Sequence, residues 1–544
     1  MLNMGLRHGD CVGIVAGNCY QYIEVFLGGA RIGCPVVVLS TAYMPEELRS
    51  AVVRSSCKLI FVSPTIGTRS LSAHIDMLLG DSRPTNPALP ELRRVVSLGD
   101  VTSFSNAGKG IEFQSYSEFV QEANSIFMNN PAFLRRAQNK VKPGDVLNLQ
   151  FTSGGYYRTA QSGNAYTHVR PPFHNHKGTS YKPADDHPSS NLINDGRFVG
   201  HALRLTPSDV VCCPPPLFHC FGLVMGFLAS FCHGSSIVFP SDHFDARRTL
   251  DAVVQEKATA LLGVPTMFVA ELEVLKTTPY QIDTLRTGLA AGSPVPAVLM
   301  DKIHERMGVQ EGLLIAYGMT ETSPVTFITS LDDPKEKKTT TLGKVLPHTA
   351  AKVVDSRGNI LPRGERGEIC TSGFALQKGY WGDEGKTKEA MRTDEEGRVW
   401  MHTGDEGFID EEGYGHITGR IKDLIIRGGE NIPPTEIEDR LIAHPSISEA
   451  CVVGLEDRKY GEVVGAFLKL AASDATAKRP ADDEVRGWVT EKLGRHKAPQ
   501  YVFWIGDPGV GDDYAKTGSG KYQKHVMRER GNALVKSGAV KAKL

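Results

Sequence analysis

Short runs of β-branched and other apolar residues alternate with longer stretches in which apolar positions recur every three or four residues. This alternation predicts β-strands joined by helices in parallel sheets. Near the N-terminus it predicts, in order, a strand, helix, strand, helix and strand at Cys11–Val15, Tyr22–Ile32, Val36–Leu39, Pro45–Val53 and Lys58–Val62. Strands of the same kind are expected at Leu147–Phe151, Val210–Cys213, Ser236–Phe239, Ala260–Gly263 and Leu313–Tyr317. The fold class is therefore α/β.

The pattern changes in the last third of the chain. From about Thr341 to Thr418, glycines and charged residues separate short strand-like runs, which predicts an antiparallel β region. These runs are Ala351–Val354, Gly367–Thr371 and Tyr414–Thr418. A smaller α+β segment follows, with strands at Ala450–Gly454 and Val463–Leu470 and a helix at Asp483–Leu493. We place a domain boundary after Gly419 and Arg420.

The most apolar stretch, Leu217–Cys232, is predicted to be a buried helix. His219 and Gly222 interrupt it, and it is shorter than the roughly 20 residues that a membrane helix requires. No membrane span is expected, and Asp10 breaks the apolar residues near the N-terminus where a secretory signal would keep an unbroken core. The ten cysteines show no C-x-x-C pair or zinc-type spacing, so we expect reduced core residues.

Length and charge narrow the class of protein further. The 544 residues correspond to roughly three to four folding units. With 61 Lys and Arg against 62 Asp and Glu, the net charge is -1, which argues against a non-specific nucleic-acid binder or a membrane-surface protein. The 56 glycines indicate many tight turns or close backbone approaches to ligands. These features favour an enzyme that acts on small molecules.

Three blocks carry candidate chemistry. Ala316–Pro324 follows an apolar strand and combines glycine, hydroxyls, an aromatic ring and the Glu321 carboxylate. It can hold a nucleotide and a magnesium ion, although a helix cap after a strand is the alternative. Met401–Asp405 with Gly419 and Arg420 offers an acid for vicinal hydroxyls and a guanidinium for an anion.

The third block, Lys516–Lys521, imitates a P-loop but fails its pattern. Ala515 replaces the first glycine, and Tyr522 stands where Ser or Thr is needed. By itself this lysine would be expected to be solvated.

The order and spacing of these blocks resemble the adenylate-forming superfamily of acyl-CoA synthetases, and most closely its medium-chain acid:CoA ligases. The likeness runs from about Gly9 to Lys524. It is carried by Leu217–Gly222, Gly263–Phe268, Ala291–Pro294, Tyr317–Pro324, Gly379–Trp381, Thr403–Asp405, Gly419–Asp423 and Gly428–Asn431. The resemblance implies a large AMP-binding domain at 1–419, a hinge at 420–424 and a smaller mobile lid domain at 425–544.

The resemblance also assigns roles for ATP binding and adenylation. Lys521 bridges the carboxylate and the α-phosphate, Glu321 holds Mg²⁺ and Thr320 bonds the phosphate. Tyr317 stacks on adenine, and Gly318 after it contacts both the nucleotide and the acyl substrate. Ala291, Gly292 and Ser293 line the base pocket. Asp405 binds the ribose hydroxyls, and Arg420 binds the ribose and phosphate side. Thr152, Ser153 and Gly154 begin the phosphate loop.

The acyl and coenzyme A sides are implied in the same way. His219, Phe221 and a strand at Val264–Met267, including Thr266, wall an apolar acyl pocket. Lys422 is the hinge residue about which the lid swings after adenylation. The swing removes Lys521 and brings Gly428, Gly429 and Glu430 to the coenzyme A side.

The phosphate loop departs from the family pattern after Gly154. From Gly155 to Ser190 the chain has one valine and no leucine, isoleucine or methionine, but it is rich in Tyr, His and Pro. A surface insertion or a histidine metal site are the alternatives. We favour translation in the wrong frame followed by intron sequence. Codons for Tyr156–Thr167 can be chosen so that a shift of one nucleotide encodes Thr-Thr-Gly-x-Pro-Lys-Ala-Ala-Met-Leu-Thr, the missing loop. Weak adenylation by this chain is then expected.

The fate of the product and the cellular address follow from the last residues. The chain ends soon after Lys521 without room for a carrier domain, so coenzyme A is the expected acyl acceptor. Ala542-Lys543-Leu544 resembles a peroxisomal address and would bind an import receptor, with the cytosol as the alternative. Two other functions stay open: a ligase of a specialised-metabolite pathway, and a catalytically dead nucleotide-binding relative. The N-terminus is expected to be clipped.

Overall fold

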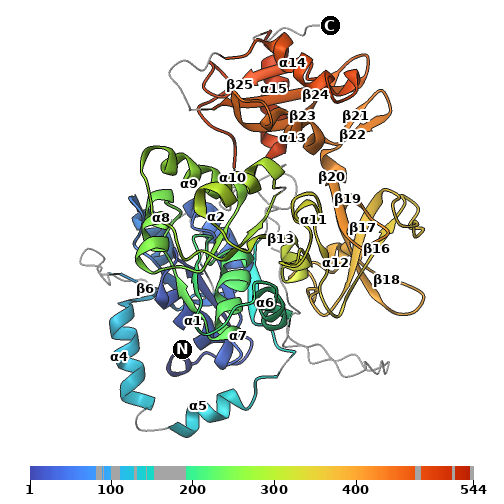
Figure 1. The fold of residues 1–544 in the computed structure, drawn as a ribbon. Helices are drawn as coiled ribbons and strands as arrows, with labels where there is room; N and C mark the ends of the chain where they lie inside the picture. The colour runs from blue at the N-terminus through green and yellow to red at the C-terminus, as the bar shows by residue number, and fades with distance from the viewer. Residues whose placement is uncertain are drawn as a thin grey trace.

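The computed structural model describes residues 1–80, 89, 91–99, 111–127, 131–142, 144–151, 191–293, 295–471, 479–516 and 521–538. They form a large lobe of three sheets and a smaller C-terminal lobe, shown in orange and red at the top of the view in Figure 1. Three predictions lie outside the described residues: the phosphate-loop residues Thr152–Gly154, the aberrant segment 155–190 and the C-terminal tripeptide Ala542–Leu544.

The first sheet has six strands, all parallel, in the order β7-β6-β3-β1-β2-β8. Its strands are β1 (Cys11–Val15), β2 (Val36–Val38), β3 (Cys57–Val62), β6 (Arg94–Ser97), β7 (Glu112–Ser115) and β8 (Asn148–Gln150). The accompanying helices are η1 (Leu2–Met4), α1 (Tyr20–Arg31), α2 (Pro45–Ser55), α3 (Ser72–Leu79), α4 (Tyr116–Phe127) and α5 (Pro131–Gln138), with a small hairpin of β4 (Thr65–Ile66) and β5 (Arg69–Ser70). Every residue of β1 and β2 is buried, as expected for strands covered on both faces.

The second sheet has seven strands in the order β10-β9-β11-β12-β13-β14-β15. The first five are parallel, and β14 and β15 close one edge antiparallel. The strands are β9 (Val210–Cys212), β10 (Ser236–Val238), β11 (Ala260–Gly263), β12 (Thr287–Ala291), β13 (Gly312–Gly318), β14 (Val325–Ile328) and β15 (Lys344–Val345). Its helices are α6 (Asn191–Ala202), η3 (Phe221–Leu228), α7 (Ala229–His233), α8 (Ala246–Gln255), α9 (Pro265–Thr277), α10 (Ala297–Met307), η4 (Thr320–Thr322) and α11 (Lys335–Thr340).

The third sheet is antiparallel, in the order β16-β17-β19-β18 with β20 also paired to β19. It contains β16 (Thr349–Val354), β17 (Gly367–Gly373), β18 (Met391–Thr393), β19 (Val399–Ile409) and β20 (Gly415–Arg420), with α12 (Glu384–Ala390) preceding β18. The antiparallel region predicted from the sequence is therefore present.

The C-terminal lobe is built on a sheet in the order β22-β21-β24-β23, with β25 parallel to β24. Its elements are β21 (Ile425–Arg427), β22 (Glu430–Ile432), α13 (Pro434–Ile442), β23 (Ile447–Asp457), β24 (Gly461–Leu470), α14 (Asp482–Thr490), η6 (Arg495–Lys497), β25 (Tyr501–Trp504) and α15 (Lys524–Lys536). The short helix η5 (Ile421–Asp423) joins β20 to β21 and contains Lys422, within the predicted hinge. The Thr435 hydroxyl donates to the Thr418 carbonyl oxygen at 2.6 Å across this junction.

The structure corrects one predicted element. The expected strand at Val264–Met267 is wrong, because Val264 precedes α9 and Pro265 occupies its first turn. Proline lacks an N–H and has a fixed φ, so it suits the first helical position and cannot extend the ladder of β11.

The predicted buried helix at Leu217–Cys232 is present from Phe221 as two consecutive parts, and its C-terminal part exposes Phe231. The fully buried π-helix η3 leads directly into α7. None of the helices in the described residues is both long and apolar enough to cross a membrane. The ten cysteines, all within the described residues, are free thiols.

Candidate active site

The end of β13 and the short helix η4 present three of the predicted nucleotide-site residues. A Cβ on Gly318 would collide with the Pro324 carbonyl oxygen, so only glycine permits this close approach of the chain to itself. The Thr322 hydroxyl accepts the Met319 N–H at 3.1 Å and donates to Pro324 O at 3.0 Å. The turn thus fixes where Tyr317, Thr320 and Glu321 leave the sheet.

A buried carboxylate supports this turn from α6. Asp195 Oδ2 accepts the N–H of Val325 at 2.8 Å, directly after the turn. Asp195 is fully buried, and burial raises its pKa well above the ordinary aspartate value despite this hydrogen bond. Asp195 therefore braces the nucleotide turn.

Asp405 joins the turn to the antiparallel sheet. The Tyr317 hydroxyl donates to Asp405 Oδ2 at 2.6 Å, and Arg420 Nε lies 2.7 Å from Asp405 Oδ1. Asp405 and Arg420 are direct partners in the β19–β20 ladder. Burial raises the pKa of Asp405, and Arg420 and Tyr317 offset only part of this effect. The residues assigned to adenine, ribose and phosphate by sequence therefore lie together.

Glu321 is the predicted magnesium ligand. Its side chain is buried, and the Tyr380 hydroxyl donates to Oε1 at 3.2 Å. Burial raises the pKa of Glu321, which Tyr380, Arg420 and Lys521 counteract only partly. A buried carboxylate of this kind fits Mg²⁺, because a cation relieves the desolvated charge and Mg²⁺ prefers oxygen ligands.

Lys521 reaches this group from the C-terminal lobe. Its Cε would lie 3.6 Å from a Cβ added to Gly292, which has a φ of +94° at the end of β12. Burial lowers the pKa of Lys521; the field of Arg420 lowers it further, whereas Cys220, Asp405 and Glu321 raise it. The lysine from one lobe and the acids from the other thus share one site.

The base-pocket residues Ala291–Ser293 follow β12. Ala291 is buried, Gly292 is intermediate and Ser293 is exposed. Their place at the carboxyl end of a parallel strand is where open α/β sheets bind ligands.

The residues assigned to the acyl pocket lie beside the turn at Tyr317–Pro324. Phe221, Val264 and Met267 belong to one buried cluster, and Thr266 is partly exposed. His219 Nδ1 accepts the Phe221 N–H at 3.2 Å, and burial followed by the field of Lys521 lowers the pKa of His219 to about 3. His219 is therefore neutral.

Cys220 contacts both the residues of the acyl pocket and the turn at Tyr317–Pro324. Cys220 Sγ lies 3.8 Å from the Thr320 hydroxyl and the same distance from His219 Nδ1.

The predicted coenzyme A residues are not part of the Lys521 site. Gly428 and Gly429 connect β21 to β22, and Glu430 begins β22, where its Oε1 lies 3.2 Å from His496 Nε2. Their separate location agrees with a role that requires a second orientation of the lobe, although the movement itself stays a prediction.

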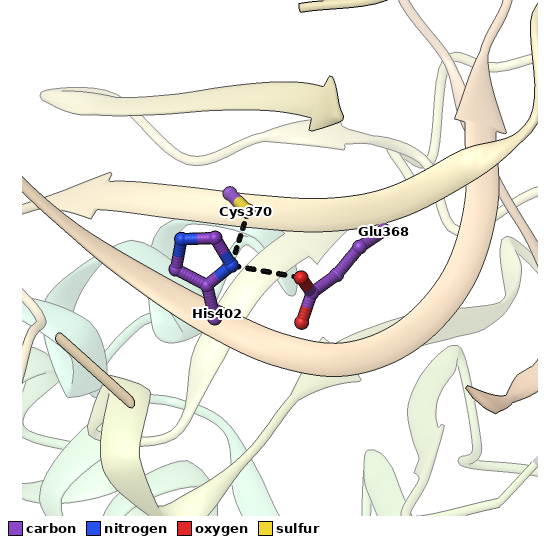
Figure 2. A group of neighbouring side chains, drawn as sticks. All are labelled: Glu368, Cys370 and His402. Carbon is purple, nitrogen blue, oxygen red and sulfur yellow. Dashed lines mark hydrogen bonds and ion pairs between the residues drawn. The ribbon is translucent and has the colours of Figure 1, made fainter. Parts of the chain in front are cut away.

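Three potential metal ligands meet between β17 and β19 (Figure 2). His402 Nδ1 lies 2.7 Å from Glu368 Oε2 and 3.4 Å from Cys370 Sγ. Burial and the neighbouring Glu368 raise the pKa of Cys370 to about 12, so its thiol stays protonated, and these side chains already satisfy one another. Glu368 Oε1 also accepts the Gly404 N–H at 3.0 Å. The group is best explained as a brace for the turn that presents Asp405.

The sequence reasoning missed several positioning residues. Tyr380 was recognised only as part of a family block, and Asp195, Glu368 and His402 received no role. Asp195 had a detectable signal, because an acid stands on the same helical face as the apolar Leu192 and Val199.

Comparison with known proteins identifies the family. The model of the AMP-binding enzyme family matches residues 1–155 and 187–381, and that of the AMP-binding enzyme C-terminal domain matches 436–521. The acyl-CoA ligase sidI of Aspergillus fumigatus is 45% identical, covering 100% of this chain and 86% of the relative. The mitochondrial medium-chain acyl-CoA ligase ACSF2 of Bos taurus is 32% identical, covering 97% of this chain and 80% of the relative.

Solved structures give the same result for the fold. ATP-bound MatB from Rhodopseudomonas palustris has a TM-score of 0.73 and 25% identity, covering 98% of this chain and 91% of that one. The chain therefore belongs to the AMP-binding enzyme family, in the branch of the adenylate-forming superfamily that contains the acyl-CoA ligases.

Proposed function

We propose that this chain is an ATP-dependent acid:CoA ligase, which adenylates a carboxylic acid and transfers the acyl group to coenzyme A. The observation that carries the proposal is the meeting of Lys521 from the C-terminal lobe with Glu321, Asp405 and Arg420 of the large lobe. This arrangement brings a cation into the electrostatic field of a ribose-binding acid and a metal-binding acid. Adenylation needs such a cation, because the attacking carboxylate and the α-phosphate are both anionic.

In the first half-reaction, each residue has a distinct task. Asp405 holds the ribose hydroxyls, while Tyr317 and Gly318 define the adenine side. Thr320 bonds a phosphate oxygen, and Lys521 and Arg420 offset the negative charge as the carboxylate oxygen attacks the α-phosphorus and pyrophosphate leaves. Glu321 would hold Mg²⁺, which would neutralise further phosphate charge when bound.

In the second half-reaction, the C-terminal lobe turns about Lys422. Lys521 then leaves the site, and Gly428, Gly429 and Glu430 approach the adenylate from the coenzyme A side. The thiol attacks the acyl carbonyl and AMP leaves. This proposal is supported by the position of these residues on the β21–β22 turn, which is separate from the Lys521 site.

The substrate class follows from the acyl wall. Phe221, Val264 and Met267 are apolar, and His219 is neutral, so no charged group on these residues favours a charged acyl tail. We propose a medium-chain fatty or aryl acid. The bovine relative's name includes medium-chain acyl-CoA ligase, which supports this choice. An acid of a specialised-metabolite pathway is the second candidate, because the pocket wall alone does not encode chain length.

The test is acid-dependent pyrophosphate release, followed by coenzyme A consumption, across a panel of straight-chain, branched, hydroxylated and aryl acids. Pyrophosphate release that depends on the acid, together with coenzyme A consumption that depends on the acid and ATP, supports the ligase. Nucleotide binding without release would instead support the catalytically dead relative.

The segment after Gly154 is proposed to weaken adenylation. The family model leaves residues 156–186 unmatched, which supports a sequence foreign to the family at this point. A chain in which the frame is restored across Tyr156–Thr167 and the following insertion is removed should release pyrophosphate faster than the present chain. Equal turnover of the two would contradict the proposal, and an unspliced transcript matching the 544 residues would contradict its origin in a wrong frame.

For the location, we propose the peroxisome, with the cytosol as the alternative. The support is the terminal Ala542-Lys543-Leu544. Removing this tripeptide from a fluorescent fusion should abolish peroxisomal import.

A further inference from the structure

A short antiparallel pairing, here called the stem, stands next to Lys521. Lys516 and Tyr522 form a β-bridge, and the Gln523 N–H donates to Ala515 O at 2.8 Å. Lys521 is therefore the residue next to the last paired position of the stem. Any change in the stem is transmitted to Lys521 through a single peptide unit.

Glu449 of β23 binds both sides of this stem through one oxygen. Its Oε2 accepts from Lys516 Nζ at 2.9 Å and from the Tyr522 hydroxyl at 2.8 Å. Its other oxygen lies 3.3 Å from Lys469 Nζ on β24. The ladder between β23 and β24 is irregular between Ile447 and Glu449, and such an irregularity re-aims a side chain.

The two neighbours Lys521 and Tyr522 point to opposite sides. The Tyr522 ring packs into the C-terminal core, with its centroid 4.9 Å from that of Tyr514. In an extended segment, successive side chains alternate between faces, so anchoring Tyr522 in this core turns Lys521 away from it. Lys521 then faces the large lobe, where Gly292 and Cys220 lie.

We propose that Glu449 is a positioning residue for adenylation: by fastening Lys516 and Tyr522 it presents Lys521 to the nucleotide site. The proposal rests on the proposed ligase function. It goes beyond that function because it assigns a role in only one half-reaction to a residue that touches neither substrate nor nucleotide. A general structural role would affect both half-reactions alike.

The principal variant is Glu449→Gln, which keeps the shape of the side chain but removes its charge. Acid-dependent pyrophosphate release should fall about tenfold, the effect of weakening one charge-assisted hydrogen-bond pair. Thioester formation from a pre-made acyl-adenylate and coenzyme A should stay within about twofold, because Lys521 has left the site in that step. Equal losses in both half-reactions, or none in adenylation, would overturn the proposal.

A double-mutant cycle tests whether Glu449 acts through its hydrogen bond with the Tyr522 hydroxyl. Tyr522→Phe should lower adenylation about threefold, and the double variant with Glu449→Gln should be no slower than Glu449→Gln alone. If the losses in the double variant were fully multiplicative, the Glu449 carboxylate and the Tyr522 hydroxyl would act independently. That result would contradict the proposal that Glu449 holds Tyr522 in place. Glu491→Gln serves as the matched control: it removes an ion pair with Arg440 in the same lobe, 2.7 Å long, without touching the stem.

Chemical labelling of Lys521 does not depend on turnover, so it tests the proposal even if this protein adenylates its substrate slowly. With AMP present, labelling of Lys521 by an amine-reactive reagent, followed by mass spectrometry, should increase severalfold in Glu449→Gln and not in Glu491→Gln. Unchanged labelling overturns the role of Glu449. Absence of acid-dependent pyrophosphate release from the unmodified and frame-repaired chains would instead contradict the ligase function, while the labelling result still decides the role of Glu449.

Discussion

In the large lobe, Glu321 and Asp405 are buried with incomplete compensation, and the pKa of each is raised. In the C-terminal lobe, burial also acts to raise the pKa of Glu449, but Lys516, Tyr522 and Lys469 outweigh it, and the pKa is lowered. Uncompensated burial of charge costs stability. Glu321 and Asp405 therefore have the electrostatic character of ligand-binding acids, whereas Glu449 already has its partners and acts as scaffold.

Asp209 shows that this distinction depends on task rather than on lobe. It lies in the large lobe next to β9, yet Arg286, Thr259 and Thr206 outweigh burial and bring its pKa to about 2. Arg286 Nη2 lies 2.9 Å from Asp209 Oδ2. Asp209 is therefore a saturated scaffold acid, like Glu449, within the lobe that holds the ligand site.

The largest effect is expected from Lys521→Met, which removes the cation that the C-terminal lobe contributes to the site of Glu321 and Asp405. Adenylation should fall about 100- to 1000-fold, because the charge that develops in the transition state loses its preorganised partner. Thioester formation from a supplied acyl-adenylate should remain within about twofold, measured by coenzyme A consumption. Lys536→Met, which breaks an exposed pair with Glu456, is the control and should change neither rate. A similar fall in both half-reactions would refute the assignment.

Glu321→Gln tests whether an uncompensated acid belongs to ligand binding. Adenylation should fall about 10- to 100-fold and require a higher Mg²⁺ concentration, because a neutral amide binds Mg²⁺ less tightly than a carboxylate. The melting temperature without ligand should be equal or higher, since a desolvated charge is removed. Titrating Mg²⁺ in the pyrophosphate assay and recording thermal unfolding gives both quantities. A marked loss of stability would place Glu321 with the scaffold acids instead.

Asp209→Asn tests an acid whose partners outweigh its burial and lower its pKa. The large lobe should lose about 1–2 kcal/mol of stability at pH 7, because Arg286 loses its 2.9 Å ion pair and keeps only the more distant Glu311 carboxylate, 3.7 Å away. A lowered carboxyl pKa stabilises the fold above the unfolded-state value of about 3.9, and this contribution is lost as the pH falls toward about 2. The difference in melting temperature between the two proteins should therefore shrink below about pH 4. A constant difference down to pH 3 would contradict the assigned ion pair.

Tyr380→Phe should have the smallest effect. It removes the hydroxyl that donates to Glu321 at 3.2 Å, a long hydrogen bond. The Mg²⁺ concentration for half-maximal adenylation should change about two- to threefold, with turnover at saturating Mg²⁺ preserved. A change as large as that of Glu321→Gln would mean that Tyr380 touches the reacting groups directly.

Much of the architecture could be read from local patterns. The strands Cys11–Val15 and Ala260–Gly263 have the predicted bounds, because short apolar runs in a buried parallel sheet carry their own signal. Val264–Met267 was misread as a strand, although Pro265 offered a helix-start signal.

The candidate site was predictable in its chemistry and not in its contacts. Tyr317, Glu321, Asp405, Arg420 and Lys521 could be named because each stands in a recognisable block. The residues that support them could not be named, because each contact joins distant segments. Tyr380 donates to Glu321, Asp195 accepts the Val325 N–H after the turn, and Glu449 accepts from Tyr522 next to Lys521.

The alternation of strands and helices and the residue types suited to nucleotide chemistry are encoded in the amino-acid sequence alone. These depend on periodicity and on short motifs, which act over a few residues. Three contacts became visible only in the folded molecule: Lys521 lies beside Gly292, Arg420 pairs with Asp405, and Glu449 binds Lys516 and Tyr522 next to Lys521. Such contacts, and the pKa changes they cause, depend on burial and on distances between remote segments, which are fixed when the sheets and lobes pack together.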